Sequence, residues 1–203
     1  MAKKKPIVAD LSTEDKIMEA ARKVFLSKGY SATRTRDIAD EAGINLALLN
    51  YYFRSKEKLF RMVMVEKMKK FFGVLMPVIY DDATTLDFKL QIIAANYINL
   101  LLEHPDLPFF VLGEIRNDPA LIVNVAQKKD FLKHSVFIKQ VREKTTIDPY
   151  QFLFNLLGMC IFPFIMRPAF QKLTDTEDLQ FRRMMNERVK LIPVWAKAIL
   201  KAK

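Results

Sequence analysis

The sequence predicts an all-α protein. Apolar residues recur at every third or fourth position along most of the 203 residues, which is the spacing of one helix face. Only five glycines are present, too few for the many tight turns of a sandwich or barrel, and no segment alternates apolar and polar residues as a half-buried strand does. Hydrophobic residues make up 51% and charged residues 28%, a composition typical of a folded chain.

Four helices are expected before residue 72. The first ends near Gly29, which can adopt a left-handed conformation, and Gly43 provides a turn between the second and third helices. Each helix starts at a side chain that can cap free backbone N–H groups: Ser12 or Thr13, Thr35, Asn45 and Ser55. A helix followed by a short helix, a glycine turn and another short helix is the helix-turn-helix arrangement of a three-helix bundle.

Longer helical patterns follow in the second part of the chain. Proline-containing breaks, the last of them at Pro168, separate these patterns. The expected helices span 86–103, 108–116, 119–145, 149–167 and 176–201. His104 precedes Pro105 in one of the breaks and is expected at the surface.

The sequence does not predict a membrane protein. The most apolar stretch, 152–166, has about 15 residues where a spanning helix needs about 20. The basic start at Lys3, Lys4 and Lys5 lacks the apolar segment of a signal peptide. A buried core helix accounts better for 152–166, and we expect a soluble, cytoplasmic protein with no membrane partner.

Positive charge is concentrated near the N-terminus. Lys and Arg outnumber Asp and Glu by 33 to 23, a net charge of +10. Residues 1–70 alone carry 16 Lys and Arg against 9 Asp and Glu. Such a basic region is typical of a nucleic-acid surface, although it could also serve only to solubilise the protein.

The residues of common catalytic sites are missing from the sequence. There is no Gly-rich phosphate loop, no GxSxG turn, no HExxH and no CxxC, and the carboxylates are scattered. One cysteine, Cys160, cannot form an internal disulfide, and two histidines are too few for a His-rich metal centre. We therefore predict that the protein is not an enzyme, with no catalytic residues, no metal ligands and no cofactor.

Residues 33–45, TRTRDIADEAGIN, and 49–60, LNYYFRSKEKLF, resemble the TetR family of transcriptional regulators. The resemblance extends over roughly residues 12–70. It implies a homodimeric repressor, bound to a double-stranded DNA operator, whose C-terminal domain binds a small ligand that weakens DNA binding. The implied domains are a basic flexible arm, 1–11, a helix-turn-helix DNA-binding domain, 12–72, with its motif at about 35–54, and a helical effector-binding and dimerisation domain, 73–203.

The third helix is expected to enter the major groove of DNA. Such a helix exposes small or polar residues to the bases and keeps an apolar face on its own bundle. Ile44, Leu49 and Phe53 are expected to face the bundle. The predicted DNA-binding residues are Thr33, Thr35, Arg36, Asn45, Ala47, Leu48, Asn50, Tyr51, Tyr52 and Lys56.

Some positions in this helix have two interpretations. Leu46 and Leu48 could contact thymine methyl groups, or they could pack against the fourth helix. DNA contact is favoured for Tyr51, whereas Tyr52 fits DNA contact and ordinary packing equally well. The lysines of the basic arm could follow phosphates or remain solvated.

The second part of the chain is rich in Phe and Met, which suits an adaptable cavity for an apolar or aromatic effector. The predicted ligand-binding residues are Asn96, Tyr97, Phe110, Phe131, His134, Phe137, Asn155, Met159 and Phe162. The last two helices carry more apolar residues than one internal face needs, which fits the four-helix dimer interface that the resemblance implies. The predicted dimer residues are Leu153, Leu157, Ile161, Met185, Val189, Ile192 and Trp195.

Overall fold

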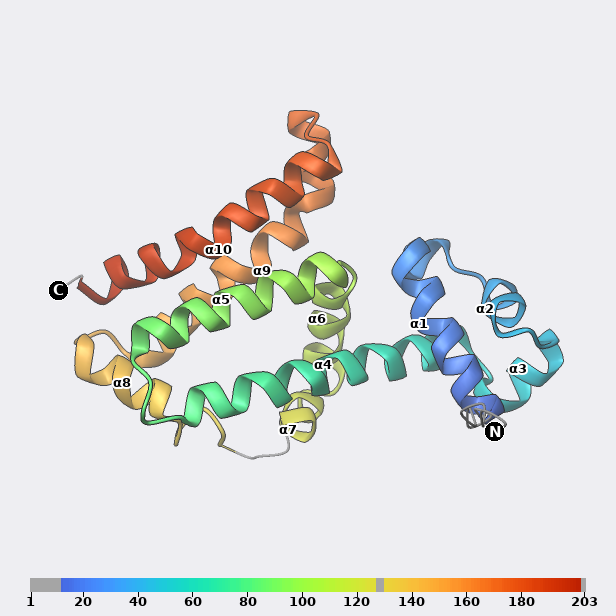
Figure 1. Cartoon of the computed structure of the whole chain (residues 1–203), viewed down its shortest axis with the longest axis horizontal. Helices are drawn as coiled ribbons and strands as arrows, with labels where there is room; N and C mark the ends of the chain where they lie inside the picture. The colour runs from blue at the N-terminus through green and yellow to red at the C-terminus, as the bar shows by residue number, and fades with distance from the viewer. Residues whose placement is uncertain (1–11, 127–129, 202–203) are drawn as a thin grey trace, which may run out of the picture. The chain divides into compact units, whose positions relative to one another are not determined.

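The computed structural model describes residues 12–126 and 130–201, and within these residues it is helical without strands (Figure 1). The predicted all-α fold class is therefore confirmed. Two compact units divide the chain, unit 1 up to Met64 and unit 2 from Val65. The predicted basic arm, 1–11, lies outside the described residues.

Unit 1 is a small helical bundle. Its helices are α1 (Thr13–Ala32), α2 (Thr35–Ala42), α3 (Leu46–Phe53) and the first part of α4 (Lys56–Tyr80). The Ser12 hydroxyl accepts a hydrogen bond from the Asp15 N–H and caps α1, as predicted. At Gly29 the φ angle is 74°, so α1 is interrupted there and one further turn leads to Ala32. The Phe25 and Phe60 rings, 5.1 Å apart, pack α1 against α4.

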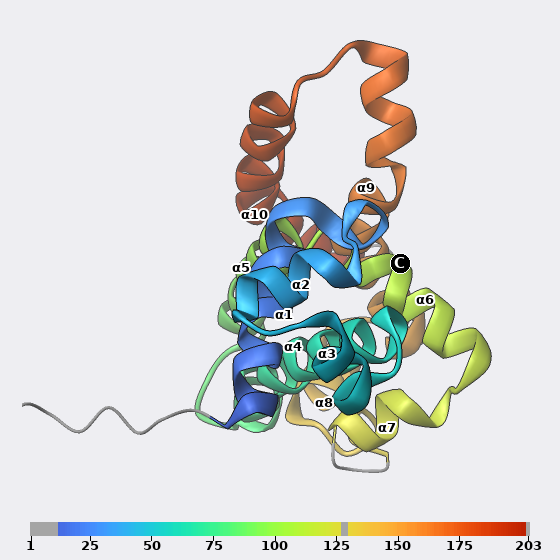
Figure 2. The same ribbon diagram turned by 90° about the vertical axis from the view of Figure 1, so that its right-hand side faces the viewer.

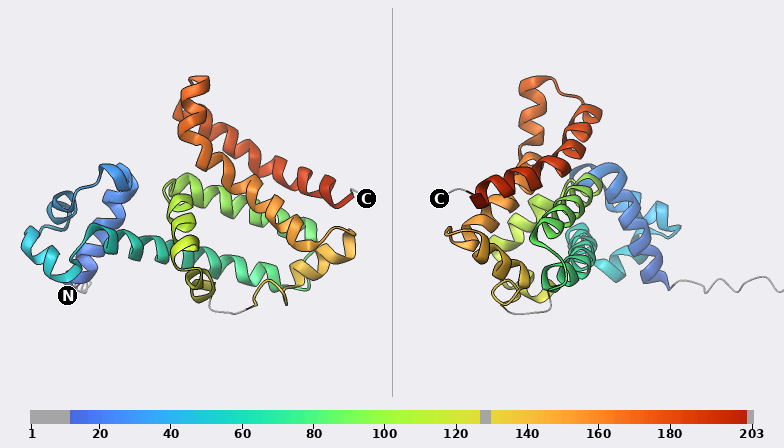
Figure 3. Two further views of the ribbon diagram at one scale, coloured as in Figure 1. Left: turned by 180° about the vertical axis from the view of Figure 1, so that it is seen from behind. Right: turned by 60° about the vertical axis from the view of Figure 1, so that its left-hand side comes forward.

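Unit 2 contains the rest of α4 and six further helices among the described residues. They are α5 (Leu86–Glu103), α6 (Leu107–Asn117), α7 (Ala120–Ala126), α8 (Val136–Lys144), α9 (Pro149–Thr174) and α10 (Asp178–Lys201). Helices α5, α9 and α10 pack side by side (Figures 1 and 3). The ends of α9 and α10 that meet near Asp175 stand away from the other helices of unit 2 (Figure 2).

The prediction of one continuous helix over 119–145 is wrong. Two helices, α7 and α8, occupy this region instead. Asp130 has a positive φ of 59°, which interrupts a helix. Ser135 then caps α8 by accepting a hydrogen bond from the Ile138 N–H. The apolar pattern is continuous over 119–145, but the helix is interrupted at Asp130 and begins again after the cap Ser135.

The predicted end of α9 at Pro168 is also wrong, because the helix continues to Thr174 and contains two prolines. Asp175, with a φ of 52°, ends it in the left-handed conformation. With 26 residues, α9 is long and apolar enough to span a membrane by length and composition alone. One of its faces, which carries Phe152, Leu156 and Phe164, is buried in unit 2, as expected for the core helix of a folded protein.

An arginine compensates for one of the prolines in α9. Pro163 has no N–H, so the carbonyl of Met159, four residues earlier, lacks its helical donor. Arg188 of α10 donates its Nε–H to this carbonyl, with a distance of 2.8 Å. The guanidinium also lies over the Trp195 ring, 4.9 Å from its centre. This single side chain links α9 and α10.

We expect Arg188→Met to destabilise the protein by about 1–3 kcal/mol, because the Met159 carbonyl would remain without a donor. Urea denaturation measures this difference as a lower transition midpoint. Arg183→Met, at an exposed position of the same helix, is the matched control and should leave the midpoint almost unchanged. Equal stability of both variants would mean that water replaces the guanidinium at this carbonyl.

A fully buried lysine holds the loop between α4 and α5. Lys89 donates its three ammonium hydrogens to the Asp81 carbonyl, the Thr84 carbonyl and the Thr84 hydroxyl, at 2.6, 2.8 and 2.8 Å. Burial lowers the pKa of Lys89, and the negative charges of Asp81 and Asp82 oppose this effect. Gln140 of α8 donates to the same Thr84 carbonyl, at 2.8 Å.

His104, expected at the surface, is buried. Its backbone N–H donates to the Leu100 carbonyl at the end of α5, and its own carbonyl accepts from the Leu107 N–H. The chain thus turns tightly here and leaves the imidazole inside unit 2. Burial, with a further contribution from Lys67, lowers the pKa of His104.

Candidate nucleic-acid interface and effector cavity

Helix α3 is anchored to unit 1 by two apolar side chains four residues apart. Leu49 and Phe53 are buried, as predicted, and Ile44 before the helix is half-buried. Asn45 caps α3, as predicted, because its side-chain oxygen accepts a hydrogen bond of 2.8 Å from the Leu48 N–H. With one face and the N-terminus fixed in this way, the opposite face of α3 is directed to solvent.

The outward face of α3 combines apolar, amide and phenol groups. Leu46 and Leu48 are 39% and 36% exposed, so both are open to solvent rather than sealed against the fourth helix. Tyr51 is 79% exposed and Tyr52 38%, and their rings contact each other edge to face at 5.4 Å. The exposed residues of this face are Asn45, Leu46, Ala47, Leu48, Asn50, Tyr51 and Tyr52. This set suits base edges and thymine methyl groups in a major groove.

The start of α2 offers a second place for a phosphate. Arg36 is exposed there and Thr35 is half-exposed. The Arg34 N–H donates to the Asp37 carboxylate at 2.8 Å, and Lys28 lies 3.0 Å from the same carboxylate. The backbone hydrogen bond and, to a lesser extent, Lys28 lower the pKa of Asp37. This carboxylate therefore fixes the N-terminus of α2, while the Arg36 side chain remains available.

Besides Asn45, two further predicted DNA-binding residues have structural roles. Thr33 is buried, and its hydroxyl donates to the Gly29 carbonyl at 2.6 Å. The Lys56 ammonium donates to the carbonyls of Tyr30 and Thr33, at 3.0 and 3.1 Å, and lies over the Tyr30 ring. Lys56 thus holds the segment between α1 and α2 in place. The Lys56 ammonium was expected to bind phosphate, but two of its three hydrogens are donated to these two carbonyls.

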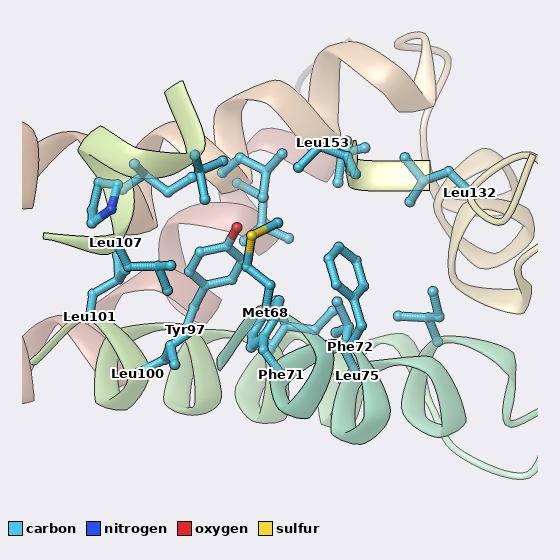
Figure 4. A pocket seen from close by; sticks show the side chains of 18 of the residues that line it. Met68, Phe71, Phe72, Leu75, Tyr97, Leu100, Leu101, Leu107, Leu132 and Leu153 are labelled. Carbon is cyan, nitrogen blue, oxygen red and sulfur yellow. The ribbon is translucent and has the colours of Figure 1, made fainter. Parts of the chain in front are cut away.

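Unit 2 contains a cavity of about 270 Å³ (Figure 4). Most of its lining residues belong to the four helices α4, α5, α6 and α9. Its lining residues are Met68, Phe71, Phe72, Leu75, Ile79, Ile93, Tyr97, Leu100, Leu101, Leu107, Pro108, Val111, Leu112, Ile115, Ile122, Phe131, Leu132, Phe137, Leu153, Leu156, Leu157 and Ile161. The Tyr97 hydroxyl is the single oxygen or nitrogen among these side chains.

The cavity contains three of the nine predicted ligand-binding residues, Tyr97, Phe131 and Phe137. The other six do not line it. On α9, Asn155 and Phe162 are exposed because the helix buries Phe152 and Leu156 instead. The six residues outside the cavity are Asn96, Phe110, His134, Asn155, Met159 and Phe162.

Sequence reasoning missed the contribution of α4. Met68, Phe71, Phe72 and Leu75 all line the cavity, although no residue before Asn96 was predicted to bind the ligand. Their spacing of three and four residues is a helix face that continues past the DNA-binding motif, so the signal was present. The missing information was what this face packs against.

Two of the seven predicted dimer residues, Met185 and Ile192, are buried in the core of unit 2. Leu153, Leu157 and Ile161 are half-buried and line the cavity. Val189 is half-buried, and Trp195 is 36% exposed beneath Arg188. The apolar residues that α9 and α10 do expose are Phe154, Phe162, Met166, Leu173, Leu179, Met184, Leu191 and Val194.

The described residues contain no cluster of three or more His, Cys, Asp or Glu side chains arranged to hold a metal ion. Cys160 is buried in α9, and burial raises the pKa of its thiol to about 12. A thiol of this kind stays protonated and unreactive near neutral pH.

Comparison with known proteins supports the interpretation of unit 1. Residues 17–63 match the family model described as "Bacterial regulatory proteins, tetR family". The chain is 25% identical to "Probable HTH-type transcriptional regulator YttP" of Bacillus subtilis (strain 168), over 94% of this chain and 95% of that protein. It is 28% identical to "HTH-type transcriptional repressor KstR2" of Mycolicibacterium smegmatis, over 52% of this chain and 58% of that protein.

Solved structures share the fold along the whole chain. A TetR-like transcriptional regulator from Rhodococcus sp. RHA1 superposes with a TM-score of 0.62 at 19% identity, over 96% of this chain and 100% of that one. The family match includes α2, α3 and the turn between them, and the Bacillus subtilis relative extends the similarity over almost the full length. Residues 17–63 are therefore a tetR-family domain, and the chain as a whole is similar to TetR-family transcriptional regulators.

Proposed function

We propose that this regulator is a homodimeric repressor that a small hydrophobic molecule releases from a near-palindromic operator. The outward face of α3 carries the DNA-binding part of this proposal, because it combines firm anchoring with exposed Asn50 and Tyr51. A relative named as a repressor supports the negative sign of regulation. Such a protein acts where its operator DNA is, in the cytoplasm.

On DNA, we place α3 in the major groove. Asn50 would pair with adenine, and Tyr51 would reach base edges or phosphates. Leu46, Ala47 and Leu48 would contact thymine methyl groups. Thr35 and Arg36, at the start of α2, would bind phosphate and set the depth of the helix in the groove.

If these leucines read methyl groups, replacing thymine by uracil in the operator half-sites should weaken binding. Each lost methyl contact removes about one buried carbon, roughly 0.8 kcal/mol, so we expect about fourfold weaker binding for each contacted thymine. Fluorescence anisotropy with the two oligonucleotides measures the ratio. Uracil placed in the flanking sequence should have no effect. Unchanged affinity after replacement in the half-sites would exclude methyl contacts by α3.

The exposed apolar face of α9 and α10 supports the dimer. Phe154 and Phe162, 66% and 59% exposed, are eight residues apart, and Gly158 lies midway between them on the same face. A β-carbon on Gly158 would meet no atom within 4 Å, so packing within one protomer does not require a glycine there. Glycine in a helix costs about 1 kcal/mol relative to alanine. Close approach of a second copy would explain both the glycine and the exposed rings.

We expect the double variant Phe154→Glu/Phe162→Glu to dissociate the dimer at concentrations at least about 100-fold above those at which the wild type dissociates, because four carboxylates would be buried at the interface. Sedimentation velocity over a concentration series measures this. Phe88→Glu, at an exposed phenylalanine of α5, is the control and should leave association unchanged. A double variant as dimeric as the wild type would place the interface elsewhere.

Release by a ligand would be a shift between two populated states. The cavity residues Met68, Phe71 and Phe72 belong to α4, the helix whose first residues are part of unit 1. A ligand that fits the cavity better in one state than in the other would favour that state and change operator affinity by the same differential free energy.

Selection of bound sequences from a random double-stranded DNA pool tests the proposed function. At about 0.15 M salt we expect a near-palindrome whose half-sites are about 34 Å, one DNA turn, apart. Such a result would establish a sequence-specific dimer. Binding without enrichment that disappears as salt rises would instead indicate a non-specific phosphate binder and would overturn the regulator model for this chain.

A further inference from the structure

The cavity of unit 2 offers a ligand one polar group. Tyr97 lies on α5, and its hydroxyl is directed into the cavity (Figure 4). Its ring is held edge to face against Phe71 of α4, with 4.6 Å between ring centres. This packing against Phe71, rather than a hydrogen bond, orients the hydroxyl.

The Tyr97 side chain is half-buried, and its hydroxyl, which reaches the cavity, has no hydrogen-bond partner within residues 12–126 and 130–201. Burial of the ring and hydroxyl raises the pKa of Tyr97, so the group stays protonated and can donate its hydrogen at any physiological pH. A donor inside an apolar cavity is stabilised by an acceptor. The apolar side chains around it provide none, so the acceptor would come from a molecule inside the cavity.

The same lining excludes ionised ligands. Among the residues that the structure describes, no Lys, Arg, His, Asp or Glu side chain lines the cavity. A carboxylate or ammonium group that entered would lose its hydration and gain no counter-ion, which costs far more than one hydrogen bond to Tyr97 returns. A carbonyl, ether or hydroxyl oxygen loses less hydration free energy on entry, and it can accept a hydrogen bond from Tyr97 in compensation.

The volume limits the size of the ligand. An apolar cavity of about 150 Å³ binds benzene, with its six carbons. In proportion, the 270 Å³ of this cavity hold about ten non-hydrogen atoms. Entry is possible beside α6, because Leu112 and Ile115 line the cavity and are also nearly half exposed at the surface.

We propose that this cavity binds an uncharged, mainly hydrocarbon or aromatic molecule of about ten non-hydrogen atoms, whose one acceptor oxygen receives the hydrogen of Tyr97. The proposal names the ligand class of the proposed function and rests on that function only for the effect of the ligand on operator binding. Occupancy of the cavity itself is independent of DNA.

Three probes of equal size and nearly equal shape test this ligand class: acetophenone, α-methylstyrene and benzoate. They share the phenyl ring and differ in the end group, which is a neutral acceptor, a hydrocarbon or an anion. Isothermal titration of the full chain at neutral pH should detect acetophenone and α-methylstyrene. Benzoate should not bind measurably.

The variant Tyr97→Phe keeps the ring and removes the hydroxyl. We expect it to bind acetophenone about two- to tenfold more weakly than the wild type and to bind α-methylstyrene equally well. Tyr150→Phe, a tyrosine of α9 that does not line the cavity, is the control and should change neither affinity. Leu157→Trp, which fills part of the cavity, should weaken both neutral probes and so locate them there.

Three results would overturn the proposal. The first is that benzoate binds as tightly as acetophenone. The second is that Tyr97→Phe binds acetophenone as tightly as the wild type does. The third is that neither neutral probe binds. Operator affinity measured without any probe separates these failures from a failure of the proposed function. If acetophenone binds through Tyr97 and leaves operator affinity unchanged, the ligand class stands and ligand-induced release is wrong.

Discussion

The double variant Asn50→Ala/Tyr51→Ala should lose at least about 100-fold in operator affinity. Each good contact to a base edge contributes about 1–3 kcal/mol, and a dimer makes each contact twice. Both side chains are exposed on α3, so their loss removes no buried side chain from unit 1 and only the surface contact between the Tyr51 and Tyr52 rings. Fluorescence anisotropy with the selected operator, at one fixed salt concentration, measures the loss.

Asn99→Ala, an equally exposed asparagine on α5 of unit 2, is the matched control and should bind the operator as the wild type does. The melting temperature and the sedimentation coefficient of the double variant should also equal those of the wild type. Wild-type operator affinity in the double variant would mean that another helix reads the bases. A uniform loss on all DNA sequences would mean that the two residues contact only phosphates.

Lys89→Met should strongly destabilise unit 2. The Asp81 carbonyl would lose a buried donor, while the methionine would fill nearly the same space. Loss of hydrogen bonds to a buried charged group typically costs about 3 kcal/mol, which corresponds to a fall in melting temperature of about 6–12 °C for a chain of this size.

Differential scanning calorimetry of Lys89→Met measures this fall, and Lys139→Met on the exposed face of α8 is its control. Lys89→Arg should not rescue stability, because the larger guanidinium does not fit a site with no exposed surface. A methionine variant as stable as the wild type would mean that the loop carbonyls reach water without the lysine.

The sequence predicted unit 1 well because its signals are local. Asn45 caps the very helix it precedes, and the four-residue interval between Leu49 and Phe53 defines which face is buried. Such features depend on residues within one or two helical turns of each other, so they can be predicted from the sequence alone. The structural role of Thr33 was not predicted. Its hydroxyl donates to the Gly29 carbonyl, an interaction that any threonine near a helix end can make, so the sequence does not single it out.

Unit 2 was predicted less well because its site depends on contacts between distant segments. The apolar pattern of α9 has no single polar face, so Leu153 and Phe154 were equally plausible for the inside or the outside. The structure separates them, with Leu153 at the cavity and Phe154 at the surface. Likewise, Tyr97 and Asn96 are neighbours in sequence, and only the packing of α5 against α4 directs the tyrosine inward.

The bond between Arg188 and the Met159 carbonyl constrains how this protein can change by mutation. If Arg188 is lost first, Pro163 leaves the partly buried Met159 carbonyl without a donor. If Pro163 is first replaced by alanine, the new N–H can serve this carbonyl, and Arg188 becomes replaceable at little cost. The two positions are therefore expected to show magnitude epistasis, since the same arginine substitution is harmful beside proline and tolerated beside alanine. Among relatives, we expect an arginine at the position of Arg188 wherever a proline occupies the position of Pro163.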